Sequence, residues 1–341
     1  MRKKIIVTLF ALIICILCSI GIQKGSGRWY SEPLAKVEQV KIQEDQQIVR
    51  AIQVNGPKKG QEIQLTSSYQ KNEIESVHLK RGNQVFYRDG VVTEKKRDGF
   101  VFFIVSLLLL TLIVVGGRTG LTSFISVTLN SAMLYLMVWF YRNHPHVPLL
   151  QVASLYTVVA IAVTLFLIDG IQKNSLKKFF ASVVTVFVAF FICYFTMALL
   201  HDKGLRFEDF GVMTRPYRPI FLASLLIGVI GAALDTVVTV ISTLDEISVH
   251  NQRLTLKELI KSGKIIGEDI SGAMVNVLIC SYFSSAIPLI LLYLMNGWSF
   301  FQTINMQLSV EALRVLCGGF GIILSIPISL GFFALGKGRA K

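Results

Sequence analysis

Charged residues are scarce in this sequence of 341 residues, of which Asp, Glu, Lys and Arg together make up 16%. A typical soluble domain carries about 25% charged residues. Hydrophobic residues make up 53%, and a soluble domain of this length could not hide that much apolar surface beneath a polar shell. The composition therefore excludes the soluble enzyme classes and predicts a protein whose main solvent is a lipid bilayer.

Cysteine is also rare, and its placement excludes a disulfide framework. All the cysteines lie in apolar runs and none lies in the polar stretch 23–98: Cys15, Cys18, Cys193, Cys280 and Cys317. That stretch therefore has neither disulfides nor a thiolate metal site. Cys15 and Cys18 have the spacing of a redox pair, but burial in an apolar helix keeps thiols protonated and inert, which favours a structural role.

Histidines and catalytic motifs are too sparse to indicate an enzyme. The histidines lie far apart in the chain, apart from one close pair: His78, His144, His146, His201 and His250. That pair is either an outer metal contact or part of a solvated loop, because two imidazoles alone make a weak site. No metalloprotease or serine-hydrolase motif occurs, and Gly263-Lys264 lacks the rest of a phosphate loop. We therefore expect no enzyme activity and no cofactor, and the question of a metal stays open.

The N-terminus carries the first long apolar run. Arg2, Lys3 and Lys4 precede an apolar stretch 5–22, which fits either a cleaved signal peptide or a signal anchor. The stretch is long enough to span a bilayer, and no convincing cleavage site follows it. We favour an uncleaved transmembrane anchor over residues 1–22, with the next segment exported.

Residues 23–98 have the pattern of a small β domain. Apolar and polar residues alternate in runs such as 37–42 and 48–54, and turn signals such as Asn55-Gly56-Pro57 separate the runs. Short strands with turns at this spacing predict a small barrel of the OB-like kind.

Residues 99–341 contain seven further apolar runs, which form a seven-helix transmembrane domain. We place the spans at 100–115, 121–141, 149–168, 179–200, 220–243, 270–294 and 312–335. The predicted fold is therefore a polytopic α-helical membrane protein of about eight transmembrane helices, with a small exported β-barrel-like domain after the first helix.

The placement of Lys and Arg accounts for much of the formal net charge of +13. Outside the β domain, most basic residues fall on the segments that are cytoplasmic if the N-terminus is inside. We therefore expect a bacterial plasma-membrane protein with both termini cytoplasmic and residues 23–98 extracytoplasmic. No compact basic patch with interleaved aromatic residues occurs, so we expect no nucleic-acid partner.

Polar residues inside the predicted spans are the candidate site, because such residues are costly in lipid. Asp235 and Thr239 share one face of the helix over 220–243. Asp269, Gly272 and Asn276 share one face of the next span at three- and four-residue spacing. We predict that these two faces meet and form an ion, proton or solute site, although structural packing is the alternative interpretation.

Secondary candidates lie on two other spans. Asn130 ends a stripe of hydroxyl residues, for which helix packing is the favoured explanation. Glu311 and Arg314 are spaced to form an ion pair across one helical turn. On the inner loop 244–269, Thr255 and Glu258 predict a capping box that begins a short helix, and Gly263 is a candidate to end it.

The sequence resembles the YibE/F-like membrane proteins over most of its length, and the N-terminal anchor and barrel resemble the YibE-type member. The motifs that carry the resemblance are Gly231-Ala232-Ala233-Leu234-Asp235 with Ser242 and Glu246, Ser262-Gly263, Ile266-Gly267, Asp269-Ile270, Gly272, Met274, Asn276, Leu278, Gly56 to Glu62, Gly116 to Gly120, and Arg314 with Gly318 and Gly321. The sequence departs from the family pattern at Glu268, where a basic residue is expected, and at Ala273 and Val277, where threonines are expected.

The resemblance implies architecture more than activity. We hypothesise a transporter or permease-like module that acts on an unknown ion or small solute. The resemblance also implies a YibF-type membrane partner, and a homo-oligomer is the alternative. A non-transporting scaffold or sensor, whose exported β domain binds a partner, is the rival function. An intramembrane hydrolase lacks a nucleophile and base pair.

Overall fold

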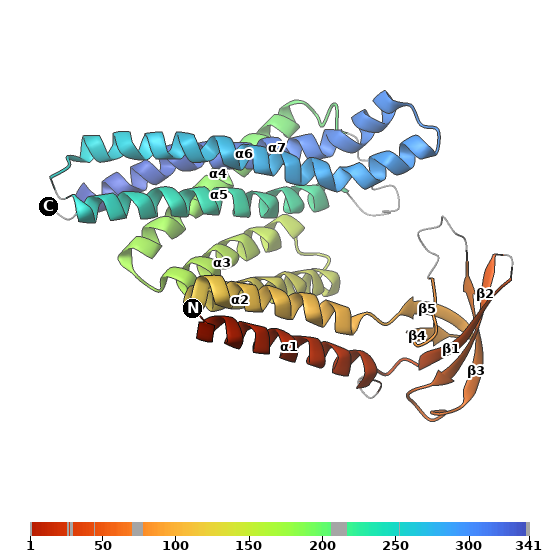
Figure 1. Cartoon of the computed structure of the whole chain (residues 1–341). Helices are drawn as coiled ribbons and strands as arrows, with labels where there is room; N and C mark the ends of the chain where they lie inside the picture. Colours follow the sequence, from red (N-terminus) through yellow and green to blue (C-terminus); the bar gives the residue numbers. More distant parts are fainter. Residues whose placement is uncertain are drawn as a thin grey trace. The chain divides into compact units, whose positions relative to one another are not determined.

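The computed structural model describes residues 2–25, 27, 30–43, 45–69, 78–205, 217–251 and 253–338. The chain divides into two compact units, Met1–Leu121 and Thr122–Lys341. Figure 1 shows the helices and strands of both units in sequence colours. The last residues, 339–341, to which the topology prediction assigns the cytoplasm, lie outside the described residues.

The first unit contains a five-stranded closed barrel. Its strands are β1 (Leu34–Gln43), β2 (Gln46–Gln53), β3 (Glu62–Ser68), β4 (Gln84–Arg88) and β5 (Val91–Lys95), in the order β1-β2-β3-β5-β4. Paired strands are antiparallel except β3 and β5. Because alternate residues of a strand point inward, Val37, Val49, Leu65 and Val85 form a buried core. The small β domain predicted from alternation is confirmed.

Helix α1 (Arg2–Gly25) and the first part of helix α2 (Asp98–Asn143) complete the first unit. Gly117 interrupts α2 with a φ of 58° and a ψ of −126°, a conformation that favours glycine. A Cβ added at Gly120 would lie 1.9 Å from the carbonyl oxygen of Leu112. Eight residues of straight helix would separate those positions by about 12 Å, so the chain turns sharply at Gly117.

This turn accounts for the difference between the predicted and the observed number of helices. The described part of the chain has seven apolar helices long enough to cross a membrane, whereas we predicted eight. The predicted spans 100–115 and 121–141 both fall within α2, which consists of two helices joined directly at the Gly117 kink without a polar loop between them.

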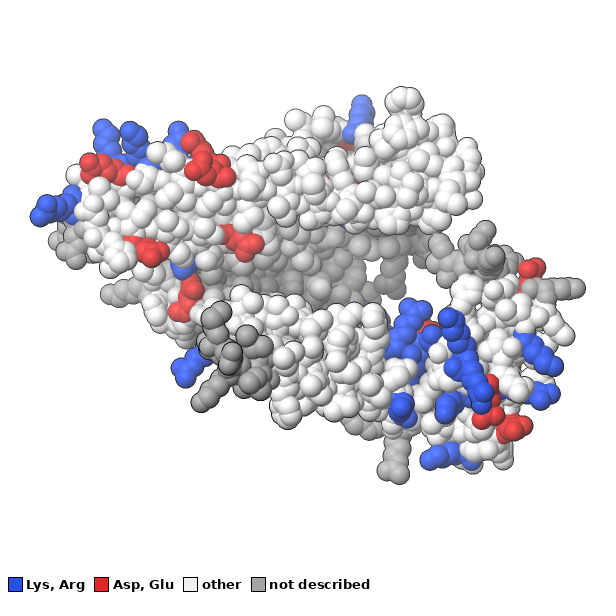
Figure 2. Space-filling view, in the orientation of Figure 1, with Lys and Arg blue, Asp and Glu red and all other residues white. Residues whose placement is uncertain are grey.

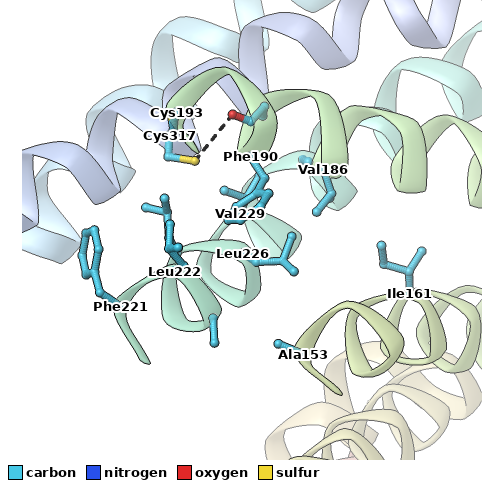
Figure 3. Packing of buried hydrophobic residues seen from close by; sticks show 14 of the residues in the cluster. Ala153, Ile161, Val186, Phe190, Cys193, Phe221, Leu222, Leu226, Val229 and Cys317 are labelled. Carbon is cyan, nitrogen blue, oxygen red and sulfur yellow. Dashed lines mark hydrogen bonds between the residues drawn. The ribbon is translucent and has the colours of Figure 1, made fainter. Parts of the chain in front are cut away.

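The second unit is a helical bundle in which α7 is central. Its remaining helices are α3 (Leu149–Asp169), α4 (Lys173–Leu199), α5 (Tyr217–His250), α6 (Leu256–Met295) and α7 (Phe300–Gly338). Helix α7 packs against α4, α5 and α6. Figure 3 shows Leu226 and Val229 of α5 beside Phe190 of α4, with Cys317 of α7 donating to a carbonyl of α4.

The start of α6 confirms one expectation and overturns another. Thr255 accepts a hydrogen bond from the Glu258 backbone, and the Glu258 carboxylate accepts one from the Thr255 N–H at 2.8 Å, so the predicted capping box is present. The helix does not end at Gly263 but continues to Met295. A Cβ at Gly263 would lie 2.6 Å from Leu330 Cδ2 and 2.8 Å from Leu244 Cδ1. This glycine therefore permits close helix packing instead of ending the helix.

Candidate functional site

The candidate residues of α5 lie on an exposed face of that helix. Asp235 and Thr239 are both exposed, although most of their neighbours in sequence are buried. The Thr239 hydroxyl donates to the Asp235 backbone carbonyl at 2.7 Å, so the Asp235 carboxylate is not held by that hydroxyl. Gly231, one turn earlier, is also exposed, and a Cβ added there would meet nothing within 4 Å.

The candidate residues of α6 form a second exposed stripe. Asp269, Gly272 and Asn276 are exposed, and the stripe continues through Cys280 and Ser284. A Cβ at Gly272 would meet nothing within 4 Å, so Gly272 makes no close helix contact within the chain. We refer to Asp235, Thr239, Asp269, Gly272 and Asn276 together as the α5–α6 polar face.

That the two halves of the α5–α6 polar face meet stays a prediction: among the described residues no hydrogen bond or ion pair joins them, and their side chains are exposed. The glycines of α6 explain why. Gly267 lies against Ile326 of α7, and Gly318 of α7 lies against Leu278 of α6. Small residues let helices approach closely, so α6 presents its glycine side to α7 and leaves its polar stripe outside.

A buried polar cluster occupies α7, and we call Gln307, Glu311 and Arg314 the α7 cluster. Arg314 forms an ion pair with Glu311, as the three-residue spacing predicted. The Arg314 guanidinium lies 5.5 Å from the ring centroid of the buried Phe221. Within the described structure, Gln307 Nε2 and Glu311 Oε2 are buried without a hydrogen-bond partner. Sequence analysis missed Gln307, although its four-residue spacing from Glu311 places both on one helix face.

Asn130 has a structural role between two helices. Its Nδ2 donates to Thr164 Oγ1 of α3 at 2.8 Å, and its backbone carbonyl accepts a bond from the Tyr156 hydroxyl at 3.4 Å. Its side-chain oxygen is buried and has no partner in the described structure. These contacts agree with the packing explanation for this hydroxyl stripe.

An ionic cluster that sequence analysis missed joins the ends of several helices in the second unit. Lys178 donates to Asp169 at the end of α3. Asp245 lies close enough to Lys177, Lys178 and Lys337 to interact with their charges. The charges of these lysines, which contribute to the predicted cytoplasmic bias of basic residues, are therefore partly neutralised by carboxylates of the same unit.

The described residues contain no group of three or more His, Cys, Asp or Glu side chains that could hold a metal ion. The candidate residues offer isolated carboxylates, amides and one partly buried ion pair. Oxygen ligands of this kind suit alkali or alkaline-earth cations, protons or a polar solute.

Comparison with known proteins agrees with the motifs. The family model described as YibE/F-like protein matches residues 104–338, which include α3 to α7 and most of α2. No curated protein and no solved structure matches the chain. The chain therefore belongs to the YibE/F-like protein family.

Proposed function

We propose that this protein is a transporter-like module in which the α5–α6 polar face lines a path for a cation, a proton or a small polar solute. The observation that supports this function is the exposure of Asp235, Asp269 and Asn276 on helices of membrane length. Apolar side chains such as Ile265 and Val277 are exposed on α6 as well, as expected of helices that face lipid.

The free-energy cost of placing a carboxylate in lipid indicates that water or another protein covers the α5–α6 polar face. A carboxylate at the centre of a membrane helix costs roughly 2.5–3.5 kcal/mol on insertion scales. Asp235, inside the predicted span 220–243, would impose that cost if this face contacted acyl chains, whereas Asp269 directly precedes the predicted span 270–294. Water in a path, or the polar surface of a partner, removes the cost.

The side chains suit the transfer of positive charge. Asp235 and Asn276 offer oxygen atoms to a hard cation, and a membrane carboxylate also serves in proton relays. Gly231 and Gly272 leave space beside these groups. We propose that a YibF-type protein, or a second copy of this chain, supplies the opposite wall of the path.

The topology that goes with this function places both termini in the cytoplasm and the barrel outside the plasma membrane. The protein then needs no catalytic residues, because the reaction is movement of a solute. A scaffold or sensor role for the barrel is the alternative, and the flux measurement below separates the two functions.

Reconstitution into proteoliposomes tests the proposal. Proton, Na⁺ and K⁺ uptake are measured with the purified chain alone and together with a YibF-type protein. We expect uptake above that of empty vesicles and a reduction of about tenfold with Asp235→Asn, which corresponds to about 1.4 kcal/mol. Asp89→Asn, a barrel-turn substitution that keeps size and removes the same charge, is the matched control. Absence of flux in every arm, or equal flux in wild type and Asp235→Asn, contradicts transport and favours the scaffold.

A further inference from the structure

The first unit contains a large cavity where the end of α1, the start of α2 and the strands β4 and β5 come together. Its volume is about 1110 Å³, and its lining includes Gly21 and Ile22 of α1, Phe86 of β4 and Phe102 of α2. The cavity belongs wholly to the first unit and shares no residue with the α5–α6 polar face.

One wall of this cavity is apolar and is formed by α2. Val101, Phe102 and Val105 line it at the first two turns of the helix. All three are exposed, with Val101 at 57%. They form a surface on which an acyl chain can lie.

Another part of the lining carries basic residues from the end of β5 and the segment that joins it to α2. Lys95 and Arg97 line the cavity, and neither forms an ion pair within the described part of the chain. The intervening Lys96 does not offer its charge to a ligand in the cavity, because its ammonium donates to the backbone carbonyls of Ile22 and Gln23 at 3.0 Å. Figure 2 shows Lys and Arg side chains gathered on the β domain.

Asp98, which follows Arg97 in the sequence, is paired with Lys96. Asp98 accepts a hydrogen bond from the Tyr30 hydroxyl and lies 3.7 Å from Lys96 Nζ. The Asp98 charge is therefore balanced by Lys96, and the Tyr30 hydroxyl adds a hydrogen bond to it. Glu94 also lines the cavity and is exposed. Because Lys95 and Arg97 carry two positive charges against the one negative charge of Glu94, this part of the lining keeps a net positive charge.

The cavity lies at the boundary between an apolar and a polar environment. On one side, α1 and α2 are long and apolar enough to cross a membrane, and on the other the chain forms a barrel with a polar exterior. Both chain connections between membrane helix and barrel pass this point. The cavity is therefore placed at the depth of lipid headgroups, where basic residues attract anionic lipids.

We propose that this cavity binds one anionic phospholipid, with its phosphate between Arg97 and Lys95 and an acyl chain along Val101, Phe102 and Val105. An arginine guanidinium donates two parallel hydrogen bonds to a phosphate, and a lysine adds a point charge. The bound lipid would fill the space beside the junction of α1, α2 and the barrel. This site is separate from the proposed transport path.

Binding of defined lipids to the full-length protein in detergent tests the site. Native mass spectrometry compares dioleoyl phosphatidylglycerol, dioleoyl phosphatidylcholine and soluble glycerol phosphate. We expect phosphatidylglycerol to bind about tenfold more tightly than phosphatidylcholine, and glycerol phosphate not to displace it. We also expect the double variant Lys95→Gln, Arg97→Gln to lose this preference, because it removes both charges that attract the anionic headgroup. The matched control Lys80→Gln, Arg81→Gln removes two exposed bases from a barrel turn outside the cavity lining.

Three outcomes overturn the proposal. The first is equal binding of the two lipids to the wild-type protein, which needs no variant to interpret. The second is displacement of the lipid by glycerol phosphate at similar concentration, which makes the ligand a soluble phosphate without an acyl-chain requirement. The third is a phosphatidylglycerol preference that survives in the Lys95, Arg97 double variant or disappears equally in the control.

Discussion

Gln23 and Lys96 exchange two hydrogen bonds across 73 residues of sequence. Lys96 Nζ donates to the Gln23 carbonyl at 3.0 Å, and Gln23 Nε2 donates to the Lys96 carbonyl at 3.1 Å. Lys96 also donates to Gln84 Oε1 of the barrel at 3.1 Å. The end of α1, the residues before α2 and the barrel are therefore tied together by one buried ammonium.

Replacement of that ammonium is expected to destabilise the first unit. Lys96→Met keeps the length of the side chain but leaves the carbonyls of Ile22 and Gln23 and the Gln84 amide oxygen without their donor. Each buried acceptor left unpaired costs about 1–3 kcal/mol, so the midpoint of thermal unfolding should fall by several degrees. Circular dichroism of the purified protein measures it. Lys41→Met, an exposed strand substitution, should leave the midpoint unchanged, and equal midpoints for both variants would show that the Lys96 contacts contribute little.

The close approach of α1 and α2 predicts a strong difference between two glycine substitutions. A Cβ at Gly99 would lie 2.7 Å from both Gln23 Cβ and Ser19 O, whereas a Cβ at Gly21 would meet nothing within 4 Å. Gly99→Ala should therefore cost about 1–3 kcal/mol through overpacking. Gly21→Ala should be neutral or slightly stabilising, because alanine favours helix. Thermal unfolding of the two variants side by side checks this, and a tolerated Gly99→Ala would disprove the tight contact.

Tyr30 is expected to ionise unusually late. The hydrogen bond from its hydroxyl to Asp98, together with burial and the Asp98 charge, raises the pKa of Tyr30 to about 12 from an ordinary value of 10.0. Because the folded-state pKa is raised, this contact stabilises the fold below pH 10 and loses its contribution between about pH 10 and 12.

An absorbance titration isolates this residue. The phenolate signal of wild type minus that of Tyr30→Phe should rise with a midpoint near 12. Replacement of the acceptor in Asp98→Asn should move the midpoint back toward 10, because it removes both the charge and the strong acceptor. A wild-type midpoint near 10 would rule out the Tyr30–Asp98 hydrogen bond as described.

The α7 cluster predicts a strong energetic coupling between its charged members. Glu311→Gln leaves the Arg314 guanidinium partly buried without its counter-charge, which typically costs about 3–5 kcal/mol. Arg314→Met alone should also destabilise, because it leaves the carboxylate unpaired. The double variant should recover much of the loss, and a double-mutant cycle on denaturant unfolding measures the coupling. If the effects of the two substitutions on the free energy of unfolding were additive, Glu311 and Arg314 would not be energetically coupled, which would contradict this prediction.

Local patterns predicted the parts of the fold that depend on neighbouring residues. Alternation predicted the barrel strands, and three-residue spacing predicted the Glu311–Arg314 pair and the Thr255 capping box. The bend at Gly117 was not predictable in the same way, because it depends on a positive φ that hydropathy does not report. The role of Gly263 was not predictable either. Its local sequence is typical of a helix end, but the residue packs against Leu330 of α7, which lies far away in the sequence.

The sequence predicted which residues of the candidate site share a helix face, but not what that face contacts. Periodicity placed Asp269, Gly272 and Asn276 on one face of a helix, and the structure keeps them on one exposed stripe. Periodicity alone does not say which face of α6 contacts which neighbour. The contact between Gly267 and Ile326 decides that, and the partner residue lies on another helix.

Water access to Cys280 tests the central claim most directly, because this native residue lies on the exposed stripe of α6. The protein carries Cys15→Ala and Cys18→Ala, which leaves the buried Cys193 and Cys317 as the other thiols. A charged, water-soluble maleimide is applied to opened native membranes, and a Leu289→Cys, Cys280→Ala variant places the thiol at an exposed apolar position on another side of α6. A water-filled path along the α5–α6 polar face predicts rapid labelling of Cys280 and slow labelling at position 289. Absence of labelling at Cys280, or equal labelling at both positions, would contradict the transport path.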